Sequence, residues 1–141
     1  MGFGLDLWSN RIKDQICGEV TDEFLELLLK GMDLAFFFSG GYRKNIEGFK
    51  GRYLFRTDDN MVTASAIFQN GDMQVKEDGI TDWDVKVTFK NAAALRNFLF
   101  SKDQDILNSI LANEVEVDGN LNYIYKFGFL AKDLGRRLGV I

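Results

Sequence analysis

Apolar residues recur at helical spacing over residues 21–38, which predicts the first long helix of the chain. Thr21 is the expected N-cap, and Ser39, Gly40 and Gly41 are expected to end the helix through a left-handed glycine. The apolar arc is broad and comprises Phe24, Leu25, Leu27, Leu28, Met32, Ala35 and Phe36. Ordinary core packing is the first explanation for this arc, and a ligand cavity or a dimer interface is the alternative.

The stretch after this helix alternates between apolar and polar residues, as half-buried strands do. We expect strands over 51–57, 61–69, 73–76 and 83–89. Asn70-Gly71 favours a type I′ turn, so the second and third strands should form an antiparallel hairpin. One face of the fourth strand, which we expect to point inward, carries Trp83, Val85, Val87 and Phe89.

Helical patterns dominate the last third of the chain. Asn91 is the expected N-cap of a helix over 92–100, and a second short helix is expected from 102 or 103 to about 111. A short strand around Val115 and Val117 then leads into a final helix over 120–138. Residues 1–20 are expected to form a loose arm or a short helix over 5–16, and residues 21–141 a single domain.

Composition narrows the class of protein. With 46% apolar and 27% charged residues in 141, the chain reads as one soluble globular domain. The most apolar stretch, residues 24–38, is interrupted by Glu26, Lys30 and Asp33 and is therefore not expected to span a membrane. The start shows no signal-peptide pattern, so we expect a cytoplasmic protein.

The absence of histidine excludes the commonest catalytic base and every site that depends on an imidazole. The single cysteine, Cys17, rules out an intrachain disulfide or a multi-thiolate metal site. The sequence therefore predicts no catalytic residues, no metal and no cofactor. A formal net charge of −4 argues against binding to nucleic acid.

Large apolar side chains, among them 13 phenylalanines, exceed what the expected elements need to hide. Surfaces lined by Phe and Met suit lipid-like ligands, because neither side chain offers a strong hydrogen-bonding group. A dense core with a dimer interface explains the same excess. The residues alone leave both explanations open.

The order of the expected elements resembles a known family. Antiparallel strands lead to the alternating strand DVKVTF at 84–89, a pair of helices follows, and VEVDGNL at 115–121 runs into a terminal helix. This arrangement is similar to the sterol carrier protein type 2 (SCP2) domain over about residues 46–139, and the helix over 21–38 resembles the first helix of that family. No peroxisomal signal follows Gly139, so the resemblance is to a bacterial or archaeal cytoplasmic member.

The resemblance implies an α+β fold with a five-stranded, mostly antiparallel sheet, covered by helices on one face and enclosing an apolar tunnel. It implies a carrier of a fatty-acyl, sterol-like or quinone-like lipid rather than an enzyme. Carried over by position, the residues expected to line the tunnel are Trp83, Val85, Val87, Phe89, Phe98, Leu99, Ile106, Ile110, Ile124, Phe127 and Leu130.

Two kinds of partner follow. In the first hypothesis the terminal helix acts as a lid whose basic residues, Lys126, Lys132, Arg136 and Arg137 against Asp133, touch an anionic membrane transiently. In the second, side chains fill the tunnel, and the apolar helices form a homodimer or an interface with a lipid- or quinone-metabolising enzyme.

Overall fold

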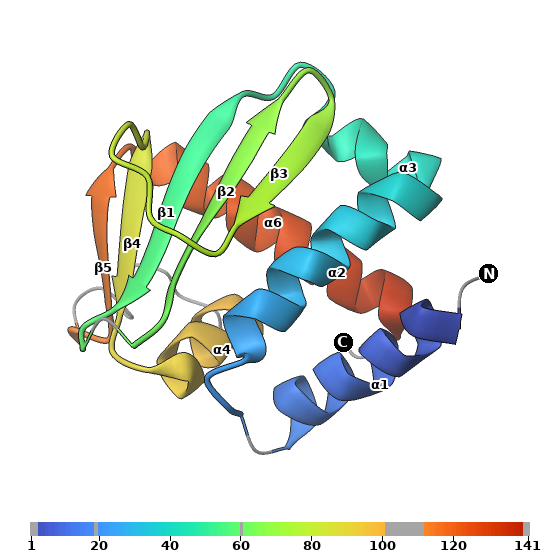
Figure 1. The fold of residues 1–141 in the computed structure, drawn as a ribbon, viewed down its shortest axis with the longest axis horizontal. Helices are drawn as coiled ribbons and strands as arrows, with labels where there is room; N and C mark the ends of the chain where they lie inside the picture. The colour runs from blue at the N-terminus through green and yellow to red at the C-terminus, as the bar shows by residue number, and fades with distance from the viewer. Residues whose placement is uncertain (1–2, 19, 60, 101–111, 140–141) are drawn as a thin grey trace.

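The computed structural model describes residues 3–18, 20–59, 61–100 and 112–139, which form one sheet with helices packed against it (Figure 1). The strands are β1 (Gly51–Thr57), β2 (Thr63–Gln69), β3 (Asp72–Lys76), β4 (Val85–Phe89) and β5 (Val115–Gly119). Their order across the sheet is β3-β2-β1-β4-β5, and only the β1–β4 pair is parallel. The predicted five-stranded, mostly antiparallel sheet is confirmed.

The β2–β3 hairpin has the expected turn. Asn70 and Gly71 have φ angles of 54° and 71°, the two positive values that a type I′ turn requires. Gln69 pairs with Asp72 in antiparallel register across this turn. Strand β3 therefore lies at one edge of the sheet, next to β2.

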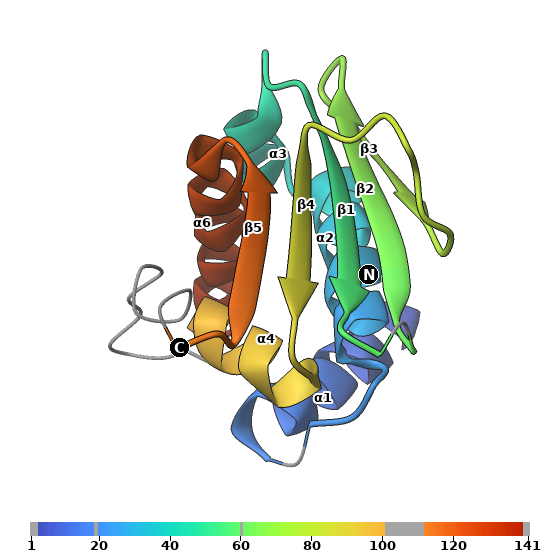
Figure 2. The same ribbon diagram turned by 90° about the vertical axis from the view of Figure 1, so that its left-hand side faces the viewer.

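The helices are α1 (Phe3–Cys17), α2 (Phe24–Phe38), α3 (Gly40–Arg43), α4 (Ala92–Phe100) and α6 (Leu121–Leu138), with the 3-10 turn η1 (Lys44–Ile46). The longer helices gather on one side of the sheet (Figure 2). The segment between β3 and β4 crosses the other side, where the Ser65 hydroxyl donates a 2.7 Å hydrogen bond to the carbonyl of Asp78. Helix α1 confirms the short helix predicted over 5–16, as opposed to a loose arm, and is slightly longer, whereas the predicted helix at 102–111 lies outside the described residues.

The structure differs from the prediction at both ends of α2. Helix α2 begins at Phe24 and its N-cap is Glu23, not Thr21. Thr21 is held by Gln15, whose amide donates to the Thr21 hydroxyl at 2.8 Å and accepts from the Thr21 N–H at 2.6 Å. The Thr21 hydroxyl also accepts from the Glu23 N–H at 3.3 Å, so Thr21 contacts both α1 and the N-cap of α2.

At the other end, no left-handed glycine caps α2. The C-cap is Ser39, which has extended backbone angles, and its hydroxyl accepts a hydrogen bond from the Tyr42 N–H at 3.1 Å. Gly40 and Gly41 start α3 instead of ending α2. The chain therefore turns from one helix directly into the next.

The N-cap predicted at Asn91 is confirmed, and α6 has clear caps at both ends. The side chain of Asn91 accepts from the N–H of Ala94 at 2.9 Å at the start of α4. Asn120 does the same for Asn122 at the start of α6, and Gly139 ends that helix with a φ of 74°. These local signals are strong because each satisfies backbone groups that a helix end leaves unpaired.

The apolar arc of α2 is covered within the chain. Phe24, Leu28 and Met32 are fully buried, and Phe36 is 3% exposed. They belong to the same hydrophobic core as Tyr53 and the other inward-facing residues of the sheet. The width of this arc is thus explained by core packing, the first of the two explanations.

Candidate functional site

Eight of the predicted tunnel residues lie together in the core. They are at most 2% exposed and comprise Val85, Val87, Phe89, Phe98, Leu99, Ile124, Phe127 and Leu130. Since neighbouring side chains cover them on all sides, a ligand that reached them would have to displace part of this packing. Their role in ligand binding stays a prediction.

The other three predicted residues are placed differently. Trp83 precedes β4 and is half-buried, and its ring lies 5.5 Å from the ammonium of Lys86. Lys86 points away from the helices, because Val85 and Val87 on either side of it point inward. Ile106 and Ile110 lie outside the described residues.

Aromatic rings fill the space between β1 and α6. The ring of Phe127 lies 4.7 Å from that of Phe55 and 5.6 Å from that of Tyr53, measured between centroids. Tyr53 also contacts the ring of Phe68 on β2 at 5.5 Å. These contacts make the centre of the sheet a packed aromatic layer.

Two buried tyrosines fasten α6 to the rest of the fold. The hydroxyl of Tyr42 donates to the carbonyl of Leu130 at 2.8 Å, and that of Tyr53 donates to the carbonyl of Tyr123 at 2.6 Å. Burial is the main cause that raises the pKa of each phenol far above its ordinary value. Both act as neutral hydrogen-bond donors and not as acid–base groups.

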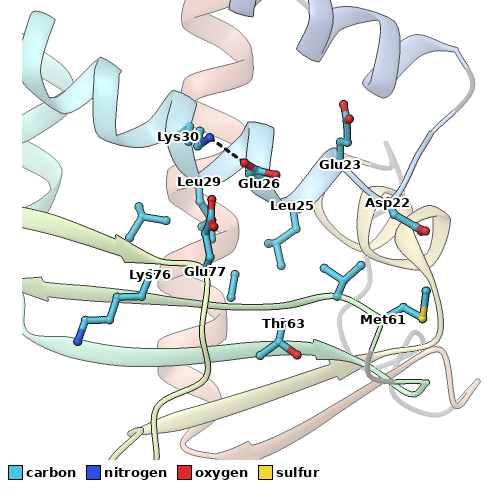
Figure 3. A pocket seen from close by; sticks show the side chains of 13 residues that line it. Asp22, Glu23, Leu25, Glu26, Leu29, Lys30, Met61, Thr63, Lys76 and Glu77 are labelled. Atoms are coloured by element: carbon cyan, nitrogen blue, oxygen red, sulfur yellow. Dashed lines mark hydrogen bonds and ion pairs between the residues drawn. The ribbon is translucent and has the colours of Figure 1, made fainter.

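A cleft of about 320 Å³ opens between the first half of α2 and the strands β2 and β3 (Figure 3). Its apolar wall consists of Leu25, Leu29, Val62, Ala64 and Val75. The two leucines are 2% and 0% exposed and belong to the main core. The cleft therefore leads from solvent directly to the hydrophobic interior.

The rim of this cleft is mostly acidic. Asp22, Glu23, Glu26 and Glu77 line it, against Lys30 and Lys76. The ammonium of Lys30 forms a salt bridge with the carboxylate of Glu26 at 2.7 Å, and this contact raises the pKa of the ammonium. The side chain of Lys76 extends away from α2 (Figure 3).

Sequence reasoning missed this cleft because it depends on how α2 meets an edge strand. The one local signal is Ala64, a small residue at an inward position of β2, which leaves room beneath the helix. Leu25 belongs to the predicted apolar arc, but the arc does not say which of its members borders solvent-accessible space.

Within the described ranges, no three Cys, Asp or Glu side chains are grouped so as to hold a metal ion. None of the described helices is long and apolar enough to cross a bilayer. Cys17 is exposed and unpaired by any disulfide. The cleft between α2 and the β2–β3 hairpin is therefore the candidate site.

No family model and no curated protein sequence matches the chain. Solved structures do match it. The UbiJ-SCP2 ubiquinone synthesis protein shares 19% identity at a TM-score of 0.57, over 79% of this chain and 98% of that one. The sterol carrier protein domain 2 of Helicoverpa armigera shares 15% identity at a TM-score of 0.53, over 80% of this chain and 87% of that one.

Two further solved structures also match the chain. A conserved protein of Thermus thermophilus, described as possibly a sterol carrier protein, shares 15% identity at a TM-score of 0.50, over 82% of this chain and 84% of that one. The sec-alkylsulfatase Pisa1 of Pseudomonas sp. shares 16% at 0.52, over 64% of this chain but 14% of its own length. The same fold thus also occurs as a small part of an enzyme.

The sheet order, the helices on one face and these matches define the class: the chain has the SCP2 fold. The resemblance inferred from its sequence is confirmed at the level of the fold. At identities of 15–19%, these matches establish the fold but not the ligand. The ligand has to be inferred from the residues of this chain.

Proposed function

We propose that the protein is a non-catalytic carrier of a hydrophobic small molecule, namely a fatty-acyl, sterol-like or quinone-like lipid, acting in the cytoplasm. One observation carries the proposal: the cleft beside α2 opens directly onto Leu25 and Leu29 of the core. Its volume of about 320 Å³ lies at the lower end of the roughly 300–1,000 Å³ range of small-molecule sites. An apolar chain seated there would cover the apolar side chains of the wall, while the charged groups of the lining stay at the rim.

The predicted tunnel residues supply the deeper part of the same site. Leu29 belongs to the same buried cluster as Val87 and Phe127. A tail longer than the cleft would extend into this cluster as side chains rearrange around it. Two of the similar structures, a ubiquinone synthesis protein and a possible sterol carrier protein, support a lipid as the ligand class.

The test is organic extraction of the purified protein followed by mass spectrometry. A stoichiometric lipid is expected from the native chain and from Gln74→Asp, a variant on the opposite face of β3. Val75→Asp places a carboxylate in the cleft wall and should remove the lipid while the fold persists, because Val75 is only half-buried. An empty native protein that also refuses added acyl ligands would contradict the proposal.

Delivery would use the outer surface of α6. Leu121, Tyr125 and Phe129 are 40%, 53% and 45% exposed, and Lys132 and Arg136 continue the same helical face. Aromatic and basic residues side by side favour an anionic membrane surface. Sedimentation with anionic and neutral vesicles tests this contact, and Phe129→Ala should weaken binding to the anionic vesicles only.

A second candidate function is an interaction module without a ligand of its own. Phe37 and Phe38 at the end of α2 favour it, because they are 75% and 51% exposed and pack on each other at 5.0 Å. A homodimer through this pair would appear as twice the chain mass in native mass spectrometry. Phe37→Ser would return such a dimer to a monomer.

A further inference from the structure

The carboxylates around the cleft point to the chemistry of the ligand's head group. Four acidic residues and two basic residues line the cleft, a formal net charge of −2. Glu26 and Glu23 have salt-bridge partners, Lys30 and Arg11 respectively, both at 2.7 Å. Asp22 and Glu77 form no salt bridge in the described part of the chain.

Glu77 is the acidic group best placed to meet a bound head group. It follows β3 directly, and its carboxylate is directed toward α2 above Leu29 (Figure 3). Asp22 lies at the other end of the cleft, close to the start of α2 (Figure 3). A molecule whose tail contacts Leu25 and Leu29 therefore has a carboxylate near each end of its seat.

Carboxylates outnumber the one cation that lies near a bound head group. The ammonium of Lys30 is paired with Glu26 and also feels the charge of Glu77, and Lys76 is directed away from the cleft. A free fatty acid would place its own carboxylate beside Glu26 and Glu77 where Lys30 is already paired, which disfavours the ionised form of the acid. A neutral head group escapes this repulsion, and a cationic one gains attraction.

We infer that the cleft selects amphiphiles with a neutral or cationic head group and rejects lipids with a free carboxylate. The inference rests on the proposed function and narrows its ligand class: among the lipids considered above it excludes ionised fatty acids and retains sterol-like and quinone-like molecules. The selecting residue is Glu77, and the apolar wall between α2 and β3 supplies the affinity.

The experiment compares three single-chain probes of equal tail length, dodecanol, dodecyltrimethylammonium and dodecanoate, each below its micelle concentration. Dissociation constants are measured by calorimetry at neutral pH and low salt. Dodecyltrimethylammonium is expected to bind about tenfold more tightly than dodecanoate, with dodecanol between them, and the ratio should shrink as salt screens the rim.

Charge reversal at the rim separates a local effect from the net charge of the protein. Glu77→Lys should invert the order of the two charged probes. Glu116→Lys changes the net charge by the same amount on an exposed position of β5, away from the cleft, and should leave the order unchanged. Equal responses of the two variants would overturn the inference, because they would show attraction to the protein as a whole.

Failure of the inference is distinguishable from failure of the proposed function. If dodecanol binds and dodecanoate binds as tightly as dodecyltrimethylammonium or more tightly, the carrier stands and the charge selection is wrong. If none of the three probes binds the native chain, both the carrier and the selection are wrong.

Discussion

The hydroxyl of Tyr53 in β1 donates a 2.6 Å hydrogen bond to the main-chain carbonyl of Tyr123 in the first turn of α6. The two residues are 70 positions apart. The bond fixes the start of α6 against the centre of the sheet, where β1 is the third of five strands. One of the polar contacts that hold the terminal helix therefore lies inside an aromatic layer, and the Tyr42 hydroxyl supplies another further along the helix.

Removing that hydroxyl should cost measurable stability. Tyr53→Phe keeps the ring contacts and loses the hydrogen bond, so we expect the free energy of unfolding to fall by about 1 kcal/mol. Tyr125→Phe is the matched control, because Tyr125 is 53% exposed on the same helix. Urea unfolding of both variants gives the comparison, and equal stabilities would show that the Tyr53 bond contributes nothing.

Alkaline pH should unfold the protein through Tyr42 and Tyr53. Burial raises the pKa of both phenols, whereas in the unfolded chain they ionise near pH 10. Above about pH 10 the unfolded state has lost protons that the folded state retains, so stability falls as pH rises, by about 1.4 kcal/mol per pH unit for each tyrosine. Below that pH neither tyrosine contributes any pH dependence.

The measurement is a series of urea titrations between neutral pH and pH values above 10, alongside phenolate absorbance of the folded protein. Replacement of both tyrosines by Phe should flatten the alkaline loss of stability. An unchanged slope in the double variant would mean that other groups cause the loss.

Phe127 should be among the most costly side chains to shorten. It is fully buried, and its ring packs on those of Phe55 and Tyr53. Phe127→Ala is expected to destabilise the fold by about 3–5 kcal/mol through lost burial and the cavity that remains. Phe129→Ala, two positions along the same helix and 45% exposed, should change stability by less than about 0.5 kcal/mol.

Gly31 should be required for α1 to pack on α2. A Cβ atom at this position would lie 1.7 Å from an atom of the Trp8 indole, whose Nε1 donates to the carbonyl of Leu27 at 2.7 Å. Gly31→Ala is therefore expected to displace Trp8 into solvent and to cost about 1–3 kcal/mol. Gly40→Ala is the control, since a Cβ there meets nothing closer than 3.9 Å.

The readout is the emission of Trp8 in a Trp83→Phe background, which leaves Trp8 as the single tryptophan. A shift to longer wavelength in Gly31→Ala, absent from Gly40→Ala, is the expected result. Unchanged emission and stability in Gly31→Ala would refute the packing argument.

Much of the fold was predictable because its signals are local. The Asn70-Gly71 turn, the Asn91 cap and the alternation in β4 each determine a short segment without reference to the rest of the chain. The prediction was wrong at Thr21: α2 has Glu23 as its N-cap, and the Thr21 hydroxyl accepts both from the Glu23 N–H and from the amide of Gln15 on another helix. Tertiary contacts of this kind are not visible in a linear pattern.

The candidate site was less predictable than the fold. Periodicity identifies Leu25 and Val87 alike as inward residues, yet only Leu25 borders the cleft. The difference arises from the edge position of β3 and from the small size of Ala64, which together leave space beside α2. The alternation of apolar and polar residues predicts that Trp83 faces the interior. Trp83 instead precedes β4, and its ring contacts the ammonium of Lys86.

The most direct test of the carrier is to locate a bound ligand by nuclear magnetic resonance of the methyl groups while dodecanol is added to the native chain. The earliest and largest shifts are expected at Leu25, Leu29 and Val75, which line the cleft. Saturable shifts there would establish the cleft as the binding site. Shifts confined to methyl groups outside the cleft, or no saturable shifts at all, would contradict a lipid carrier that binds its ligand in this cleft.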